Sequence, residues 1–350
     1  LNLTLIAAAL VAAPWFDAPV YALAWGVLVA GVVQLLFQLP FLAQIHRLPN
    51  PKVDWRDEGV RRVLRLMVPA IFGVSVSQIN LLLDTVIASF LPTGSISWLY
   101  YSDRLSELPL GVFGIAIATV ILPSLSRQHA ARTGEVFSRT LDWALRMVLL
   151  VAIPAAVALM ILAEPILTTL FYYGDVMTPR DIGMAVLSLQ AYAIGLIAFM
   201  LIKVLAPGYF ARQDMKTPVR IGVIALVTNM VLNLAFALPL DHYFGIGHVG
   251  LALATSLAAM LNAGLLFRGL YRFGIYHPSP GWRRFLLTLL GANLVMATVL
   301  LGFTAHLNQW LFWGGWQRAG WMLLMCLSGM LVYTLFLLVG GMRPSHLRHR

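Results

Sequence analysis

The sequence predicts an all-α polytopic membrane protein with about ten transmembrane helices. Hydrophobic residues make up 60% of the chain and charged residues only 11%, with a mean hydropathy of +0.83. A soluble domain of 350 residues needs a charged surface, which this composition cannot supply. Apolar runs of spanning length alternate with short loops, the longest being residues 43–62. No loop has room for a soluble catalytic domain, so any function must reside between the helices.

The apolar runs place the spans in order along the chain. The first is apolar from residue 1 onward and lacks both the basic stretch and the small-residue cleavage site of a signal peptide, so we expect the chain to start inside a membrane helix. Pro207 and Gly208 end one of the later spans. The expected spans are residues 1–13, 20–42, 63–91, 98–124, 142–172, 182–206, 218–240, 249–270, 284–305 and 319–340.

Basic residues gather in alternate loops. Of the 24 lysines and arginines, 18 fall in the loops after the second, fourth, sixth and eighth spans and in the tail, and two, Arg180 and Arg318, fall in the opposite loops. By the positive-inside rule the basic loops and the C-terminus are cytoplasmic. In a membrane protein this basic charge is not a sign of nucleic-acid binding.

The span 98–124 carries three charges at depth. Trp98 and its neighbouring tyrosines suit the outer interface, and Arg104 lies about 9 Å deeper at 1.5 Å per residue. Asp103 and Glu107 share a face, and Glu107 can pair with Arg104. Two interpretations stay open: the arginine is neutralised or snorkels, or it faces a polar cavity and binds an anionic substrate. Pro109 and two following glycines make this span bendable.

Three other spans carry polar groups that could converge. Asp84 lies deep in the span 63–91 without a basic neighbour. Asn229 and Asn233 share a face of the span 218–240, and Thr255 lies in the next span. Together their oxygens would form a candidate site for sodium or a proton, with too few carboxylates for tight binding of a divalent metal. The alternative is ordinary polar packing between helices.

Lys203 lies near the basic end of its span. It either snorkels to lipid phosphate or contacts a substrate at the inner gate. The eight histidines form no zinc-binding spacing, and no phosphate-binding glycine loop is present. The sequence therefore predicts neither a metal, another cofactor nor direct use of ATP.

Two long stretches resemble a known family. They are "LMVPAIFGVSVSQINLLLDTVIASFLPTGSISWLYYSDRLSELPLGVFGIAIATVILPSLSR" and "LIKVLAPGYFARQDMKTPVRIG". Both are similar to the MurJ (MviN) family of bacterial lipid II flippases, in the multidrug/oligosaccharidyl-lipid/polysaccharide exporter superfamily. The similarity is dense over residues 60–270.

The resemblance implies fourteen helices in two six-helix lobes and a final pair. By that count residues 1–42 end the first lobe, 43–62 form a cytoplasmic linker, 63–270 form the second lobe, and 271–350 hold the final pair and a basic tail. The first four helices, which contribute further cavity arginines in the family, would precede this chain. We therefore expect the chain to hold only part of the substrate site and not to transport alone.

The implied function is movement of undecaprenyl-pyrophosphate-linked disaccharide-pentapeptide (lipid II) to the outer leaflet of the bacterial inner membrane for peptidoglycan synthesis. Arg104, Asp103, Glu107 and Lys203 would contact this substrate. Membrane lipids are the other expected partners. The resemblance implies that a groove between the second lobe and the final pair holds the polyprenyl tail, and the apolar sequence of residues 284–340 permits this. Alternatives are an exporter of another polyprenyl-linked oligosaccharide, a drug exporter, an intramembrane enzyme or a scaffold. An enzyme would need clustered carboxylates or histidines at one membrane face, and a scaffold would leave the deep charges unexplained.

Overall fold

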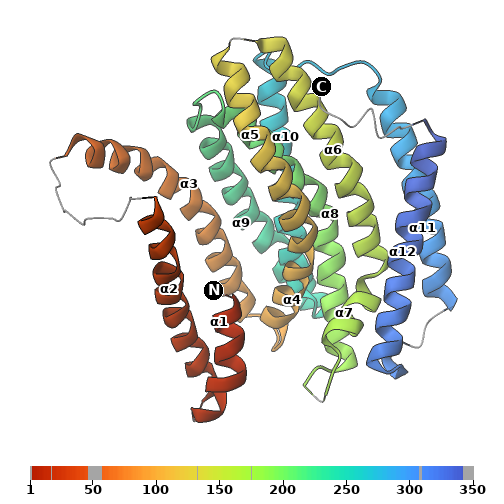
Figure 1. The fold of residues 1–350 in the computed structure, drawn as a ribbon. Coiled ribbons are helices and arrows are strands. Elements are labelled where there is room, and N and C mark those ends of the chain that lie inside the picture. Colours follow the sequence, from red (N-terminus) through yellow and green to blue (C-terminus); the bar gives the residue numbers. More distant parts are fainter. Residues whose placement is uncertain are drawn as a thin grey trace. The chain divides into compact units, whose positions relative to one another are not determined.

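The computed structural model describes residues 2–16, 18–45, 57–131, 133–174, 176–306 and 310–341. All regular structure within these ranges is helical (Figure 1). Eight of the helices are long and apolar enough to cross a membrane, and Asn2–Trp15 and Gln78–Ser89 are shorter apolar helices. The predicted all-α polytopic fold is confirmed. The chain divides into two compact units, Leu1–Leu66 and Met67–Arg350.

The first unit is a helical hairpin followed by the start of a third helix. Small residues allow close packing within the hairpin, because Ala22 and Ala30 are buried and Gly26 faces Ala8 with no room for a side chain. Its elements are α1 (Asn2–Ala7), η1 (Ala8–Ala12), η2 (Ala13–Trp15) and α2 (Pro19–Gln44), and then α3 (Glu58–Ser89) begins. Most of the predicted basic linker, residues 46–56, lies outside the described residues.

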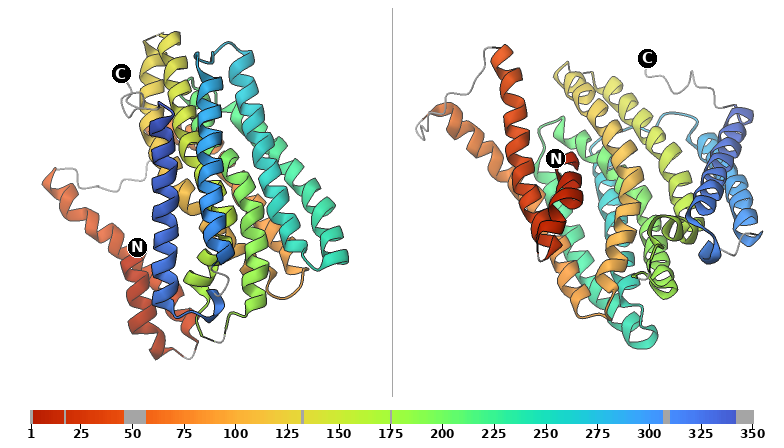
Figure 2. Two further views of the ribbon diagram at one scale, coloured as in Figure 1. Left: turned by 90° about the vertical axis from the view of Figure 1, so that its right-hand side faces the viewer. Right: turned by 60° about the horizontal axis from the view of Figure 1, so that its bottom comes forward.

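The second unit is built around one central helix, α8 (Pro179–Phe210). It contacts α4 (Ser95–Pro109), α5 (Ile115–Ala130), α6 (Gly134–Ile161) and α10 (Gly247–Arg272), and α10 in turn packs along α9 (Lys216–Phe244), as Figure 2 shows from two sides. The main core consists of fully buried side chains on these helices, among them Leu141, Leu189 and Leu266. Gly195 on α8 touches the backbone of Ser256 on α10, so a larger residue at that position would push the two helices apart.

One kinked shaft is formed by α4, a single π-turn called η3 (Leu110–Gly114), and α5. The turn starts directly after Pro109, which has no amide hydrogen to donate to the preceding turn. A π-turn holds one more residue than an α-turn and is often found at functional sites. The shaft as a whole, Ser95–Ala130, is one candidate membrane span.

The span predicted over residues 142–172 is two helices, so that prediction was wrong in detail. The helix α6 ends at Ile161, Leu162 leaves helical geometry, and α7 (Ala163–Phe171) follows as a separate short helix. Pro165 cannot donate a hydrogen bond to the carbonyl of Ile161, which interrupts the ladder at this point. Both sides of the break are apolar, so hydropathy alone could not show it.

The final pair packs on the lobe through its own apolar cluster. It consists of α11 (Trp282–His306), the short η4 (Trp310–Phe312) and α12 (Gly315–Val339). The helices form a hairpin in which α11 lies on α6 and α12 on α7 (Figure 2). Leu289, Met296 and Met325 are fully buried between them. Residues 342–350 of the predicted tail lie outside the described residues.

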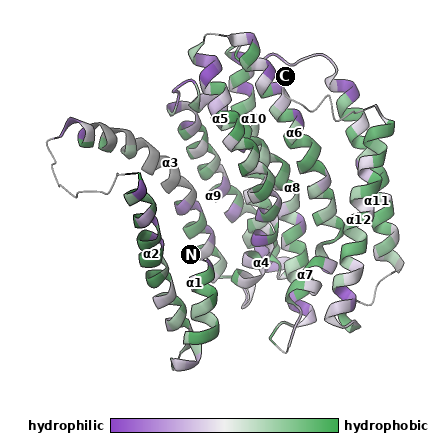
Figure 3. Ribbon diagram, in the orientation of Figure 1, coloured by the Kyte–Doolittle hydropathy of each residue, from purple (hydrophilic) through white to green (hydrophobic). Residues whose placement is uncertain are grey.

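Hydrophobic residues cover most of each helix, while hydrophilic residues gather at the ends and along α4 (Figure 3). Polar groups within the apolar length of a span are costly unless they are partnered or functional. The polar side chains of α4, α3, α9 and α10 are therefore the candidates for a functional site.

Candidate functional site

Arg104 and Glu107 form an ion pair on α4. The Nη1 of Arg104 lies 2.7 Å from Oε2 of Glu107, and the two side chains are 54% and 49% exposed. The guanidinium also lies over the ring of Tyr100, 5.1 Å from its centre. All three residues lie within two turns of one helix, so the helix itself sets their geometry. About half of the Arg104 side-chain surface is left uncovered by the described residues.

Asp103 is the neighbouring carboxylate on the same helix. It is half-buried, and its charge interacts with those of Glu107 and Arg104. It also lies close enough to Asp84 on α3 for the two carboxylates to repel each other. Asp103 therefore connects the arginine cluster to a second polar cluster.

The second cluster joins α3, α9 and α10 around Asp84. Asn80 donates from Nδ2 to Oδ2 of Asp84 at 3.1 Å, and Asn233 donates from Nδ2 to Oδ1 at 2.6 Å. Asn233 also donates to Oδ1 of Asn229 at 3.1 Å. The Oγ1 of Thr255 lies 3.3 Å from the side-chain amide of Asn229. The structure thus brings together the four predicted side chains and adds Asn80.

The side chains around Asp84, here called the Asp84 cluster, provide several oxygen atoms that could bind a cation. When its oxygen and nitrogen are exchanged, the amide of Asn229 no longer accepts from Asn233, but it donates to Asp84 and Asn80 and accepts from Thr255. The Oδ1 of Asn233 is buried and has no donor among the described residues. A carboxylate, a hydroxyl and a free amide oxygen are the ligands that a small monovalent cation needs. Whether a cation binds here stays a prediction.

The two clusters share one face of the lobe. The buried Tyr192 on α8 interacts electrostatically with both Asp84 and Asp103. A change of charge at Asp84 therefore changes the electrostatic potential at Asp103, which lies beside Arg104 in the chain.

Lys203 is placed elsewhere. Its side chain is exposed, and its stem passes Gly114 in the π-turn. Gly114 lies ten residues beyond Arg104, or about 15 Å at 1.5 Å per residue. The structure therefore does not bring Lys203 together with the Arg104 cluster.

Two buried charged residues, Asp142 and Arg318, were not identified from the sequence. Asp142 accepts hydrogen bonds from Tyr276, Ser279 and Trp282 and pairs with Arg146 at 2.9 Å. Its partners lie up to 140 residues away, so no local signal pointed to them. Arg318, expected in one of the opposite loops, is 5% exposed and lies in the first turn of α12.

Arg318 has no carboxylate partner among the described residues. Its guanidinium donates to the carbonyls of Thr168 and Tyr172 at the end of α7 and to those of Trp310 and Leu311 in η4. Four carbonyls therefore satisfy the charge, and the residue ties three elements together. Among the described residues no three His, Cys, Asp or Glu side chains could jointly hold a metal ion.

A family model described as "Lipid II flippase MurJ" matches residues 1–314. The chain belongs to this family. The similarity inferred from the two sequence stretches is confirmed, and the MurJ family consists of flippases rather than enzymes. Membership of the MurJ family, together with the candidate membrane spans, identifies a multi-pass inner-membrane protein.

Curated relatives agree with the family assignment. Proteins named probable lipid II flippase MurJ from Haemophilus influenzae and Vibrio cholerae are 49% and 51% identical over 99% of this chain. A lipid II flippase MurJ from Burkholderia cenocepacia is 47% identical over 86% of it. The matches cover 68%, 65% and 58% of those proteins, so the chain spans about two thirds of their length.

Solved structures show the same fold. A lipid II flippase MurJ in an inward closed conformation matches 96% of this chain and 64% of its own, with a TM-score of 0.71 and 26% identity. A multidrug resistance transporter of the MATE family matches 78% of the chain with a TM-score of 0.51 and 16% identity. The second likeness concerns the fold alone and agrees with the predicted superfamily.

Proposed function

We propose that this chain takes part in moving lipid II from the inner to the outer leaflet by alternating access. The MurJ relatives are named as lipid II flippases, and the chain shares about half of its residues with two of them. The observation that carries the proposal is the half-exposed Arg104, which lies on a candidate membrane span and has one ion-pair partner among the described residues. Intramembrane charge of this kind is by default functional.

The chemistry of Arg104 suits a pyrophosphate. A guanidinium grips phosphate oxygens with two parallel hydrogen bonds, and those bonds are stronger than neutral ones. Glu107 holds the guanidinium while no substrate is bound, and a pyrophosphate oxygen can take its place as the acceptor. Asp103 adds a second negative charge beside them and limits the affinity for other anions.

We further propose that a sodium ion or a proton at Asp84 is coupled to this step. A cation there cancels the negative charge that Asp103 meets from α3. The potential around Arg104 then becomes more positive, and a pyrophosphate binds more strongly. The buried, unpartnered Oδ1 of Asn233 gives the cation an additional oxygen. The basic loops and the C-terminus would face the cytoplasm.

Two variants at the chromosomal locus test the role of Arg104. Arg104→Ala should accumulate in the membrane as the wild type does, because removing a charge from a span relieves a cost of about 2.5–3.5 kcal/mol. Outer-leaflet lipid II, measured with an external probe, should nevertheless fall at least tenfold. Arg104→Lys should restore only part of it, since an ammonium lacks the fork geometry.

The same experiment separates the alternatives. An alanine variant that is abundant and fully active would remove Arg104 from substrate binding. A variant that is absent from the membrane would assign the residue to folding. A flippase for another polyprenyl-linked oligosaccharide would show the loss with that lipid instead. A drug exporter is disfavoured, because Arg104 would repel a cationic drug.

A further inference from the structure

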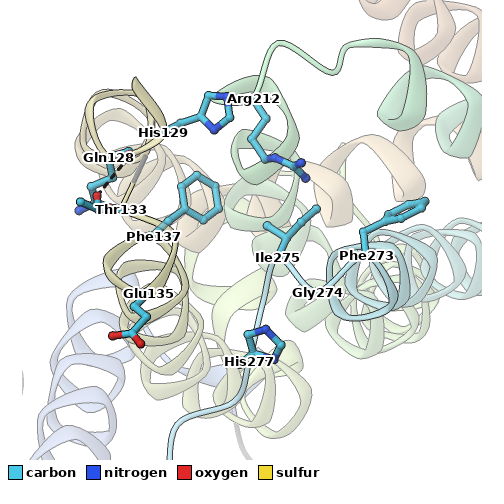
Figure 4. A pocket seen from close by; sticks show the side chains of 11 residues that line it. Gln128, His129, Thr133, Glu135, Phe137, Arg212, Phe273, Gly274, Ile275 and His277 are labelled. Atoms are coloured by element: carbon cyan, nitrogen blue, oxygen red, sulfur yellow. Dashed lines mark hydrogen bonds between the residues drawn. The ribbon is translucent and has the colours of Figure 1, made fainter. Parts of the chain in front are cut away.

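A cavity of about 490 Å³ opens at the basic-loop end of the lobe, away from both polar clusters. Side chains from four segments surround it: the end of α5, the start of α6, the residue pair after α8 and the residues after α10 (Figure 4). Gln128 in its wall lies 24 residues beyond Arg104 on the same shaft, or about 36 Å at 1.5 Å per residue. The cavity is lined by Gln128, His129, Thr133, Gly134, Glu135, Phe137, Arg212, Phe273, Gly274, Ile275 and His277.

The wall carries an arginine and two histidine rings that can donate hydrogen bonds. Arg212 and the rings of His129 and His277 are exposed and have no hydrogen-bond or ion-pair partner among the described residues. Figure 4 shows the guanidinium of Arg212 extending toward Ile275 and Phe273, with the His129 ring behind it at the rim. The one carboxylate, that of Glu135, lies 3.4 Å from Arg139 and is partly neutralised by it. The cavity therefore presents unsatisfied donors to an anion.

The inner wall combines an apolar surface with an unsatisfied acceptor. Phe137 is buried and Ile275 half-buried. The side-chain nitrogen of Gln128 donates to Ser124 and Thr140, but its Oε1 is buried without a donor. An acceptor left in this state is unfavourable, and a hydroxyl donor from a ligand would satisfy it.

The segment after α10 is held rigidly in place. Gly274 adopts a left-handed conformation with φ +64°, which turns the chain back so that the amides of Ile275 and Tyr276 both donate to Leu270. His277 then exchanges two hydrogen bonds with Ser138 on α6, through its amide at 2.9 Å and its carbonyl at 3.2 Å. The cavity wall is thus formed before any ligand arrives, which lowers the entropic cost of binding.

We propose that this cavity binds a phosphate ester that carries a free hydroxyl, such as glycerol phosphate. Arg212 and the two histidines contact the phosphate, the Gln128 oxygen accepts from the hydroxyl, and Phe137 and Ile275 cover the carbon chain. The volume is several times that of a phosphate ion, which leaves room for the ester group. The ester is either a soluble metabolite or the headgroup of an anionic phospholipid, and basic pockets between helix ends are suited to both.

Two binding measurements on the purified full-length protein test this site. In the first, protein in lipid-free detergent is titrated with sn-glycerol 1-phosphate and with inorganic phosphate by calorimetry. In the second, nanodiscs containing phosphatidylcholine and phosphatidylglycerol are used, and the phosphatidylglycerol retained per protein is counted by mass spectrometry. Saturable binding in the first arm identifies a soluble ester, and selective retention in the second arm alone identifies a headgroup.

Variants assign the binding to this cavity. Arg212→Gln should weaken it at least tenfold, while Arg283→Gln, an equally exposed arginine at the same end but outside the cavity, should not change it. Gln128→Leu should weaken the binding of glycerol phosphate but leave the binding of inorganic phosphate unchanged. Arg212 is exposed, so its variant should melt as the wild type does.

Two results would overturn the proposal. One is the absence of binding sensitive to Arg212 in both arms. The other is equal loss in the Arg212 and Arg283 variants, which would reduce the effect to general attraction by a basic surface.

Discussion

Single charged residues in this lobe fall into two kinds. Asp142 and Arg318 are about 5% exposed, and each is surrounded by several hydrogen-bond partners. Arg104 keeps half of its surface open and has one carboxylate partner. A charge that is fully partnered stabilises the fold, whereas a charge that keeps free hydrogen-bonding capacity remains available to a substrate.

Asp84→Asn should change how transport depends on sodium or on membrane potential. The variant can accept only one of the two amide hydrogen bonds that Asp84 accepts, and it loses the charge that attracts a cation. Outer-leaflet lipid II measured across a sodium series, with and without an ionophore, should show at least a tenfold shift in half-saturation. Asp181→Asn, a carboxylate in the same lobe outside the cluster, is the control. Normal activity with unchanged ion dependence in Asp84→Asn would remove this residue from the mechanism.

Arg318→Met should destabilise the protein without altering substrate chemistry. Methionine fills similar space but takes a donor from four carbonyls, of which that of Thr168 keeps the amide of Tyr172, at about 1–3 kcal/mol for each of the others that water cannot reach. Thermal unfolding in detergent should shift down clearly, and proteolysis near Trp310 should accelerate. Arg180→Met, at an exposed arginine in the first turn of α8, should change neither. A methionine variant as stable as the wild type would mean that the carbonyls find other donors.

At the scale of elements, Asp142 fixes the segment between α10 and α11 to α6. Tyr276, Ser279 and Trp282 reach it from that segment, and Arg146 stacks on Trp282 while pairing with the carboxylate. Burial and the hydrogen bond to Asp142 raise the pKa of Tyr276, so its hydroxyl stays a donor over the physiological range. The position of the final pair against the lobe depends on this one carboxylate.

Asp142→Ala should cost about 3–5 kcal/mol of unfolding free energy, because it leaves the Tyr276 hydroxyl and the Trp282 indole without their acceptor and Arg146 without its carboxylate partner. Tyr276→Phe should cost about 1 kcal/mol. Because the pKa of Tyr276 is higher in the folded state, its stabilising effect is complete below the ordinary tyrosine value of about 10 and is lost as the pH rises above it. The stability difference between wild type and Tyr276→Phe should therefore shrink above pH 10. A constant difference up to pH 11 would contradict the assigned hydrogen bond.

Helix positions could be predicted from the sequence because bilayer thickness imposes a length that hydropathy detects. The charges of α4 could be found for the same reason, since they interrupt an apolar run. The convergence around Asp84 was only a hypothesis, because Asn233 lies 149 residues away and no local pattern gives that distance. The distant partners of Asp142 and Arg318 were not predicted for the same reason, because they lie 140 and 150 residues away in the chain.

For the whole molecule, the side on which each loop lies is a testable consequence of the charge bias. In a Cys326→Ser background, Val176→Cys should react with an impermeant maleimide in cells whose outer membrane is permeabilised, since Val176 is 95% exposed in an opposite loop. Met215→Cys, in a basic loop, should react only after the inner membrane is opened. The reverse pattern would invert the proposed topology and the direction of transport.

The extra residue in the π-turn shifts the angular phase of the shaft. Each residue of an α-helix advances about 100°, so Ser102 and Leu125 would point about 140° apart on an uninterrupted helix. Both are fully buried. Discounting one residue for the π-turn brings them to within about 40° of each other, which allows both to face the core. A helical wheel drawn from Arg104 therefore assigns the wrong side to every residue beyond Gly114, and cysteine-scanning or crosslinking data along this shaft need two wheels, offset by one position.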